Sequence, residues 1–267
     1  MIDVKLAGQK VAAEIHGTGP TLILFHSLLA DRSSFDRVAG PLAAHFRVVL
    51  PSLPGFPGSE FVDDHLAAVA DRMAEAVREV AAGEQSILLG NGYGGFVALL
   101  LAIRHPGLIT RLVVSDAGAA FSQAGREAFR TMSRVAGDKG LGAVADVAMR
   151  RLFAPDFHAA NPELVAERRR RFIAMDKAVF LAACRELAAL DLRSQLAQVT
   201  IPVLALVGEQ DEATPPVMSR EMVALLPAAE LIVLPGCAHV PQLQAPDQFL
   251  AAAMPFLSVP ESKAAGS

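Results

Sequence analysis

The sequence predicts an α/β fold: a mostly parallel sheet flanked by helices, with a helical cap inserted in the chain. Short runs rich in Val, Ile and Leu alternate with helix-like segments, which is typical of strands joined by crossover helices. These runs are nearly continuous in apolar residues, as expected for strands that are buried on both faces. The alternation stops between residues 121 and 190 and then resumes.

Seven segments are predicted to be strands. In chain order they are residues 10–15, 21–25, 47–50, 86–89, 109–114, 201–207 and 230–234. The first two flank the glycine-rich turn at 17–20, and Pro51 ends the third. This order of strands predicts a single sheet that is built before the cap and completed after it.

The region without strand candidates predicts the domain organisation. We expect residues 1–120 and 191–257 to form the core, residues 121–190 to form the helical cap, and residues 258–267 to be a mobile tail. We expect an apolar pocket between cap and sheet, to which some of the large apolar residues of the cap contribute. The candidates are Phe121, Phe129, Met132, Met149, Phe153 and Phe172.

Composition and charge limit the partners. The 267 residues carry a formal net charge of -4, so we expect a small-molecule substrate rather than nucleic acid or an anionic membrane; an oligomer is possible but not indicated. Cys184 and Cys237 are not in a C-x-x-C pair, which favours free thiols in a reducing cytoplasm. The N-terminus lacks an apolar run of signal-peptide length, and we expect a cytoplasmic protein. We interpret the basic run at 168–171 as a solvated helix face.

The glycine-rich turn after the fourth predicted strand allows two interpretations. Gly90, Gly92 and Gly95 spell G-x-G-x-x-G, a dinucleotide-binding pattern, and Asp116 follows the next strand, where a ribose-binding acid would lie. However, such a turn belongs to the first βαβ unit of its domain, whereas three predicted strands precede it here. A dinucleotide site also leaves the remaining motifs unexplained, so this interpretation is the remote alternative.

The second interpretation rests on motifs that are spread along the chain. FHSL at 25–28 is similar to an oxyanion loop, and LPSLPGFPGS at 50–59 is similar to a D-x-P-G-x-G-x-S turn in which Ser52 replaces the acid. GEQD at 208–211 fits G-x-x-D, and GCAH at 236–239 fits G-x-x-H. With these motifs, residues 11–257 resemble the α/β-hydrolase family, and most of all its enol-lactonase and small-ester hydrolase branch. GNGYG at 90–94 is similar to the G-x-S-x-G turn of this family, the nucleophile elbow. The chain order of elbow, acid and histidine is the one this fold requires.

The resemblance implies a role for each matching residue. His239 would be the general base, and Asp211 would hold its ring in the required tautomer. The backbone amides of Leu28 and Tyr93 would form the oxyanion hole. Asp116 is the alternative acid, because some family members place the acid after the preceding strand. No residue requires a cofactor, and no histidine pairing indicates a metal site.

One position departs from the family pattern: Gly92 stands where the nucleophilic serine is expected. Glycine has no side chain, so no acyl-enzyme can form through it. The Asp211–His239 pair could instead activate water held in the vacant serine position, or move a substrate proton in a lyase or decarboxylase reaction. Alternatively, the chain is a non-catalytic binding protein or an engineered Ser-to-Gly variant of an esterase or lactonase. Ser27 and Asn91 are candidates for binding substrate, and Asn91 is also a candidate for binding that water.

Overall fold

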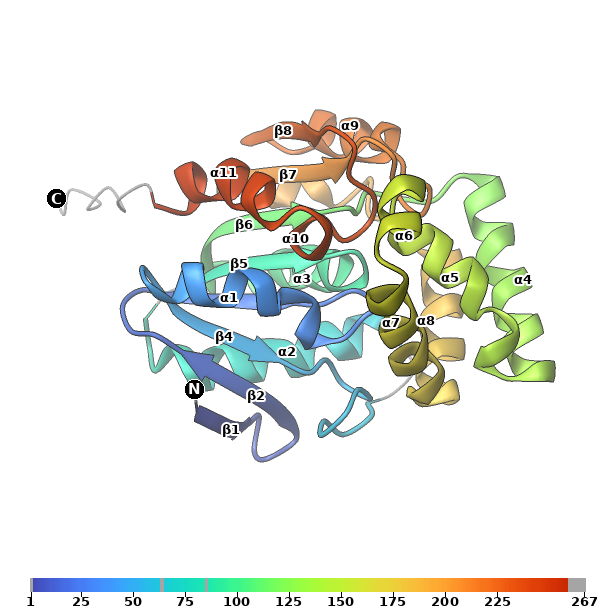
Figure 1. Cartoon of the computed structure of the whole chain (residues 1–267). Helices are drawn as coiled ribbons and strands as arrows, with labels where there is room; N and C mark the ends of the chain where they lie inside the picture. The colour runs from blue at the N-terminus through green and yellow to red at the C-terminus, as the bar shows by residue number, and fades with distance from the viewer. Residues whose placement is uncertain (1, 63–64, 85, 259–267) are drawn as a thin grey trace, which may run out of the picture.

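The computed structural model describes residues 2–62, 65–84 and 86–258. Among these residues, eight strands form one sheet in the order β1-β2-β4-β3-β5-β6-β7-β8 (Figure 1). Their bounds are β1 Ile2–Leu6, β2 Val11–His16, β3 Thr21–Phe25, β4 Arg47–Pro51, β5 Ser86–Asn91, β6 Ile109–Ser115, β7 Val203–Gly208 and β8 Ala229–Leu234. The β1–β2 and β2–β4 pairs are antiparallel and the other pairs are parallel. The α/β class predicted from the sequence is confirmed.

The seven predicted strands are all present, with ends that differ by at most two residues. β1 is the one strand of the sheet that the sequence analysis missed. It lies at the sheet edge, and only Leu6 of its five residues is buried. Its apolar and polar residues alternate, so it lacks the continuous apolar run that marks the central strands.

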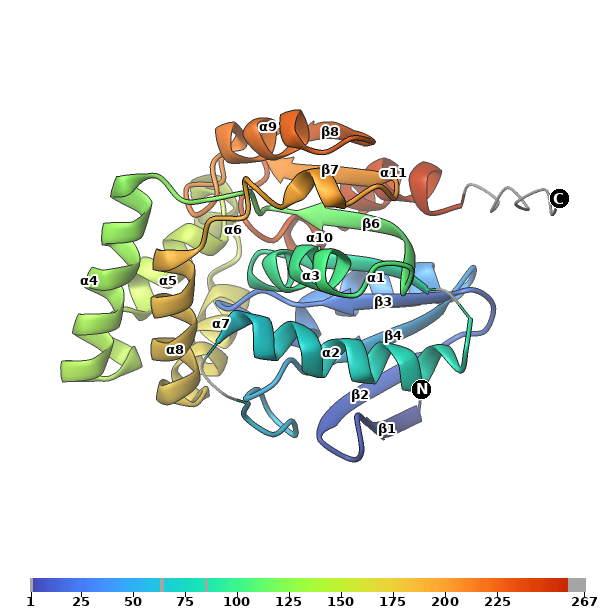
Figure 2. The same cartoon turned by 180° about the vertical axis from the view of Figure 1, so that it is seen from behind.

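Helices cover both faces of the sheet. One face is covered by α1 (Asp36–Ala43) and α11 (Pro246–Leu257), and the other by α2 (Leu66–Ala81), α3 (Tyr93–Arg104) and α9 (Pro216–Leu225) (Figures 1 and 2). Successive side chains of a strand point to opposite faces. Leu22 and Leu24 of β3 therefore join the core beneath α1 and α11, whereas Ile23 and Phe25 join the other core. The core thus holds the carboxyl ends of β3 and β5 rigidly between two helical layers.

Between β6 and β7 the described chain forms helices. They are α4 (Gln123–Lys139), α5 (Ala145–Leu152), α6 (Pro155–Ala160), α7 (Pro162–Ala174) and α8 (Lys177–Ala189), with 3-10 turns at Leu141–Ala143 and Leu196–Gln198. An isolated antiparallel bridge joins Ala120 to Asp191, so the chain enters and leaves this insertion side by side. We call residues 121–190 the cap. It lies at the carboxyl ends of the parallel strands (Figure 1).

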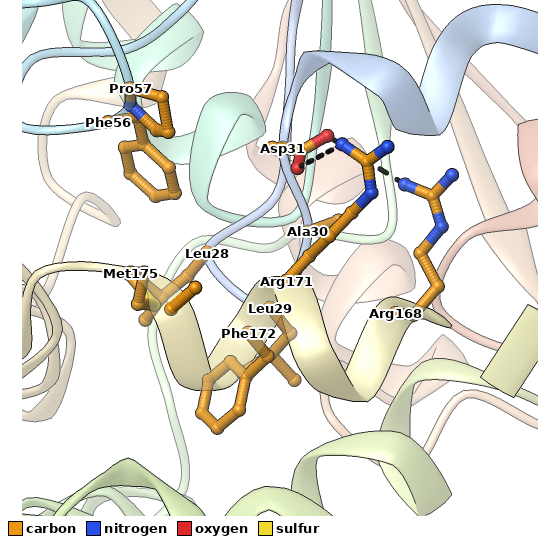
Figure 3. Close-up of a pocket in the computed structure, with 11 residues that line it drawn as sticks. Leu28, Leu29, Ala30, Asp31, Phe56, Pro57, Arg168, Arg171, Phe172 and Met175 are labelled. Atoms are coloured by element: carbon orange, nitrogen blue, oxygen red, sulfur yellow. Dashed lines mark hydrogen bonds and ion pairs between the residues drawn. The ribbon is translucent and has the colours of Figure 1, made fainter. Parts of the chain in front are cut away.

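The basic run at 168–171 is not a solvated helix face throughout. Arg168 is only 6% exposed; its guanidinium donates to Ser33 Oγ at 2.7 Å and lies 3.7 Å from Asp31 Oδ1. Arg171 also pairs with Asp31, at 3.3 Å (Figure 3). The prediction is wrong for Arg168 because α7 packs on the loop after β3, a contact that no local pattern shows. These ion pairs anchor the cap to that loop.

Two predictions concern the ends of the chain and its relation to membranes. Of the predicted tail at 258–267, residues 259–267 lie outside the described residues. Within the described part of the chain, no helix combines the length and the apolar character that crossing a bilayer requires.

Candidate active site

The turn between β5 and α3 has the backbone of a nucleophile elbow. Gly92 has φ 54° and ψ -118°, a conformation that glycine adopts far more readily than other residues. A Cβ on Gly90 would lie 2.3 Å from the carbonyl oxygen of Gly94, and one on Gly94 would lie 2.4 Å from that of Phe25. Only glycines permit α3 to start this close to the strands. The scaffolding of the elbow is therefore present, without a side chain at its apex.

The side chain of Ser27 fills the space beside Gly92. A Cβ added at Gly92 would lie 2.6 Å from Ser27 Oγ and 3.0 Å from Ser27 Cβ. Ser27 lies two residues after β3, and β3 pairs in parallel with β5, so the two turns leave the sheet side by side. A water at the serine position would therefore lie beside the Ser27 hydroxyl, and that such a water is activated there remains a prediction.

His239 and Asp211 form a buried pair beneath the cap. Asp211 follows β7, and His239 lies in the loop between β8 and α10 (Pro241–Gln244). His239 Nδ1 and Asp211 Oδ2 are 2.9 Å apart, and the residues are 4% and 3% exposed. Because the Nδ1 hydrogen faces the carboxylate, Nε2 carries the lone pair that a general base needs. Nε2 lies 3.2 Å from Ser27 Oγ.

The Asp211 carboxylate is held by its own turn. Oδ1 accepts hydrogen bonds from the backbone amides of Ala213 at 2.7 Å and Thr214 at 3.1 Å, and the Thr214 hydroxyl lies 2.6 Å from Oδ2. Burial acts to raise the pKa of Asp211, but the charge of His239 and these hydrogen bonds outweigh it and lower the pKa. Asp211 is therefore a charged partner for the imidazole. The sequence analysis missed Thr214, which the spacing of a threonine three residues after the acid could have indicated.

Asp116, the alternative acid, is not the partner of His239. Its Oδ1 accepts from the Gly208 amide at 2.8 Å, and its Oδ2 accepts from the Ser115 hydroxyl at 2.5 Å. Burial and then the charge of Asp211 raise the pKa of Asp116 well above its ordinary value. The pKa values of the two buried carboxyls are thus shifted in opposite directions, and Asp211 is the one that favours the charged form.

Asp116, Asp211 and His239 lie close enough to hold a cation, but each already has hydrogen-bond partners in the protein. One atom each of Asp116, Asp211 and His239 lies within 4.8 Å of the others, a spacing that a cation could bridge. However, both carboxyls accept hydrogen bonds from backbone amides, and His239 Nδ1 faces Asp211. A cation at this place would have to displace those contacts. That the protein uses no metal or cofactor remains a prediction.

Asn91 does not reach the cavity, so the prediction that it binds substrate or water is wrong. Its side chain is fully buried; Nδ2 donates to the carbonyl of His239 at 2.9 Å, and Oδ1 accepts from Gln242 Nε2 at 3.0 Å. Asn91 is the last residue of β5, and its hydrogen bond to the His239 carbonyl holds the loop of His239 against the end of this strand. Gln242 completes this clamp, and no motif in the sequence marks it.

Two backbone amides lie where an oxyanion hole requires them. Leu28 directly follows Ser27, and Tyr93 is the first residue of α3, where the amides of a helix have no partner within it. Within the described residues, neither amide has a hydrogen-bond acceptor in the protein. Leu28 and Tyr93 also line the same cavity as His239. The geometry fits the predicted role of these amides, which remains a proposal.

The cavity at this site is small and mostly apolar. It has a volume of about 30 Å³ and is lined by Ser27, Leu28, Leu29, Gly92, Tyr93, Phe129, Met132, Arg151, Phe180, Leu187, Ala213, Thr214 and His239. The cap thus contributes Phe129 and Met132, as two of the expected apolar residues. Arg151 is the cation of the lining; its Nη1 contacts Met132 Sδ at 3.5 Å, and no carboxylate of the described chain pairs with it. An anionic group of a ligand could pair with this side chain.

A second cavity of about 140 Å³ lies between the loop after β3 and α7 (Figure 3). Phe56, Phe172 and Met175 line it, and the paired Asp31 and Arg171 lie at its side. Leu28 and Leu29 line both cavities. Movement of these two side chains would join the apolar space to the site.

Fold and site together define a protein of the α/β-hydrolase class: an elbow after β5, an acid after β7 and a histidine after β8. The model of the alpha/beta hydrolase family matches residues 15–253, and the chain belongs to this family. This match and the fold overturn the dinucleotide interpretation. Gly90 and Gly94 serve close packing of α3 on the strands.

Individual relatives are similar along nearly the whole chain. The pimeloyl-[acyl-carrier protein] methyl ester esterase of Vibrio vulnificus (strain CMCP6) is 26% identical over 253 residues, covering 88% of this chain and 93% of the relative. A thermophilic esterase from Thermogutta terrifontis has a TM-score of 0.86 at 24% identity, covering 96% of this chain and 98% of that one. The enol-lactonase from Burkholderia xenovorans LB400 has the same TM-score and identity, covering 97% of this chain and 100% of that one. The two structures show that the fold is shared.

Proposed function

We propose that this protein hydrolyses small carboxylic esters or lactones, with His239 as the general base and Asp211 as the group that orients it. The observation that carries the proposal is the buried 2.9 Å contact between the two side chains, with Nε2 directed toward the elbow. The names of the relatives, which are esterases and an enol-lactonase, support the same reaction class.

The chemistry follows from the order of the contacts. His239 Nε2 takes the proton of an attacking hydroxyl, and the charged Asp211 stabilises the imidazolium that forms. The carbonyl oxygen of the substrate becomes an oxyanion, which the amides of Leu28 and Tyr93 can stabilise by about 3 kcal/mol each. The imidazolium then returns its proton to the leaving alkoxide. No part of this sequence requires a side chain at Gly92.

The cavity restricts the substrate. A volume of about 30 Å³ is that of one water molecule in the liquid, so even a short acyl group requires Leu28 and Leu29 to move toward the second cavity, and a longer chain requires a larger movement. Arg151 favours an ester or lactone that carries a carboxylate, because this cation has no ion-pair partner among the described residues. We therefore expect monoethyl succinate to be hydrolysed faster than ethyl butyrate, which has a similar length but no charge.

The experiment compares wild type with His239→Ala, and uses His45→Ala, an exposed histidine, as the matched control. The substrates are 4-nitrophenyl acetate, butyrate and hexanoate, the two ethyl esters above, a five-membered enol-lactone and acetoacetate. We expect ester and lactone hydrolysis by wild type and His45→Ala, decreasing with acyl length, and a loss of about 10²- to 10⁴-fold in His239→Ala.

Other outcomes decide between the remaining functions. Turnover of acetoacetate without ester hydrolysis would assign the His239–Asp211 pair to moving a substrate proton. If none of these compounds is turned over but they stabilise wild type against thermal unfolding, the protein is a binding protein and the hydrolase proposal fails.

A further inference from the structure

We propose that Ser27 is the nucleophile of this protein, and that Gly92 leaves the space in which the Ser27 hydroxyl reaches His239. This assignment deepens the proposed function and rests on it. Two neighbouring turns bring these residues together. Ser27 lies in the turn after β3, and Gly92 lies in the elbow after the adjacent strand β5.

The first argument is the contact with the base. Ser27 Oγ lies 3.2 Å from His239 Nε2, and His239 Nδ1 lies 2.9 Å from Asp211 Oδ2. Because Nδ1 donates to the carboxylate, Nε2 accepts and the Ser27 hydroxyl donates. Hydroxyl, imidazole and carboxylate are therefore linked in the order that nucleophilic catalysis requires.

The second argument is the location of the hydroxyl. Ser27 Oγ and His239 Nε2 each lie 2.6 Å from the place where a Cβ on Gly92 would stand. The hydroxyl thus lies directly beside the place where the side chain of the elbow residue would begin. Ser27 is 1% exposed but lines the cavity together with Gly92 and Tyr93. A substrate carbonyl placed in this cavity meets the hydroxyl and the amides of Leu28 and Tyr93 from one side.

The third argument is that the backbone of Ser27 is fixed. His26 is fully buried; its Nε2 accepts from the Leu53 amide at 3.1 Å, so its Nδ1 carries the hydrogen and donates to the Ser27 carbonyl at 3.0 Å. Burial lowers the pKa of His26 to about 4, which keeps this ring neutral. The Gly94 amide of the elbow donates to the His26 carbonyl at 3.1 Å. This hydrogen bond fixes the position of the turn after β3 relative to the elbow, and a preorganised nucleophile needs such a fixed backbone.

Other nucleophilic groups near the site are engaged elsewhere. Cys237 Sγ lies 3.2 Å from Gln248 Oε1, and burial, followed by the charge of Asp116, raises its pKa to about 11. The Thr214 hydroxyl lies against Asp211 and the Asp116 carbonyl. Burial raises the pKa of the Tyr93 hydroxyl above its ordinary value. Among the described side chains, Ser27 carries the hydroxyl that contacts His239 Nε2.

The reaction balances without a further reagent. Ser27 Oγ attacks the carbonyl carbon while its proton moves to His239 Nε2. The C–O bond to the leaving group breaks, the imidazolium protonates that oxygen, and an ester on Ser27 remains. A water then attacks this ester and gives its proton to His239; the acid leaves, and the imidazolium returns the proton to Ser27 Oγ. In a lactone, the leaving oxygen stays attached to the acyl group throughout, so the second half releases a single hydroxy acid.

The test uses methanesulfonyl fluoride, a small reagent that loses fluoride when a serine oxygen attacks its sulfur. Wild type, Ser27→Gly, the exchange variant Ser27→Gly/Gly92→Ser and the control Ser219→Ala are treated, and the sulfonylated peptide is located by mass spectrometry. Ser219 is a fully buried serine outside the site that donates to the Ala117 carbonyl. Hydrolysis of 4-nitrophenyl acetate and thermal unfolding are measured on the same samples.

We expect sulfonylation of Ser27 in wild type and Ser219→Ala, and none at position 27 in Ser27→Gly. Hydrolysis should fall about 10²- to 10³-fold in Ser27→Gly, because the nucleophile is lost. The loss should not be larger, because the oxyanion hole and the His239–Asp211 pair remain. In the exchange variant the reagent should react with the serine introduced at position 92, which shows that the site still assembles. This recovery would also exclude a merely structural effect of removing Ser27.

The outcomes for Ser27 and for the proposed function are distinguishable. If Ser27→Gly hydrolyses the ester within threefold of wild type, water is the nucleophile; the assignment of Ser27 fails and the hydrolase proposal stands. If Ser27 is sulfonylated but no ester or lactone is hydrolysed, the hydrolase proposal fails and Ser27 remains the reactive group. If wild type does not react while the exchange variant does, the assignment is overturned.

Discussion

The turns after β3 and β5 lie side by side, and each has what the other lacks. The turn after β5 has the elbow backbone, with φ 54° at Gly92, but no side chain there. The turn after β3 has the hydroxyl of Ser27 on an ordinary backbone. Among the described residues other than glycine, positive φ occurs at Ala7, Gln9, Ala82 and Asp116. The two turns share one base, because His239 Nε2 faces both.

This difference teaches that the backbone of the elbow and the reacting hydroxyl need not belong to one residue. Neighbouring strands lie about 4.8 Å apart, so a side chain from one turn reaches the space above the next. A serine at an elbow also holds backbone strain of about 1–3 kcal/mol, which a glycine avoids. In this protein the residue with the elbow backbone, Gly92, is therefore a different residue from the one that carries the hydroxyl, Ser27. Four changes test it, from the largest expected effect to the smallest.

Changes to the His239–Asp211 pair, which both turns share, should have the largest effect on hydrolysis. Asp211→Asn removes the charge beside His239 and presents an amide hydrogen to Nδ1, so we expect hydrolysis to fall by about 10³- to 10⁴-fold. Asp116→Asn is the matched control, because the Asp116 carboxyl accepts from the Gly208 amide and the Ser115 hydroxyl, whereas His239 pairs with Asp211; its activity should stay within about tenfold of wild type. Steady-state hydrolysis of 4-nitrophenyl acetate measures both. Equal losses in the two variants would contradict the assignment of Asp211.

The elbow itself should tolerate no side chain while Ser27 is present. The methyl group of Gly92→Ala would lie 2.6 Å from both Ser27 Oγ and His239 Nε2. We expect about a 10²-fold loss of hydrolysis and a decrease of about 2–4 kcal/mol in the free energy of unfolding. Denaturant unfolding measures the second quantity. In Gly137→Ala, a position of α4 where the added Cβ meets nothing within 4 Å, hydrolysis should be unchanged and the free energy of unfolding should not fall, because alanine favours a helix; a fully active Gly92→Ala would refute the packing argument.

Asp116, a buried carboxyl with a raised pKa, accepts a hydrogen bond from Asn91, which directly precedes Gly92 of the elbow. Above the ordinary pKa of 3.8, the unfolded chain releases the proton of Asp116 while the folded protein retains it. The free energy of unfolding therefore falls as pH rises, by at most about 1.4 kcal/mol per pH unit, until the raised pKa of Asp116 is reached. Asp116→Asn lacks this contribution, so its stability relative to wild type should increase as pH rises above 4. Urea unfolding at several pH values measures the difference, and a difference independent of pH would contradict the prediction.

Ion pairs tie the turn after β3 to the cap, and weakening them should give the smallest effect. Asp31→Asn weakens the ion pairs with Arg168 and Arg171. We expect a KM raised by less than tenfold, an unchanged kcat and a loss of about 1 kcal/mol of stability. The control Asp146→Asn removes an exposed pair with Arg169 within the cap and should leave KM unchanged. A larger effect on kcat than on KM would mean that Asp31 positions Ser27.

Much of the fold was predictable because its signals are local. Continuous apolar runs mark the central strands, and only β1, an edge strand with alternating residues, escaped them. At the site, Asp211 and His239 could be recognised because each stands in a short motif directly after a strand. Thr214 and Gln242, which orient or clamp them, were not recognised. The partner of Gln242 comes from a distant segment, whereas Thr214 bonds to Asp211 in its own turn and could have been indicated by that spacing.

The sequence by itself determined that an elbow with Gly92, an acid at Asp211 and a histidine at His239 meet at the ends of parallel strands. Only the tertiary structure decided what lies beside Gly92. Ser27 is far from it in the sequence, and the sheet order β4-β3-β5 makes their turns neighbours. It also decided that Asn91 faces the His239 carbonyl rather than the cavity. The physical reason is that local patterns specify strands and turns, whereas strand order and packing specify which side chains share a space.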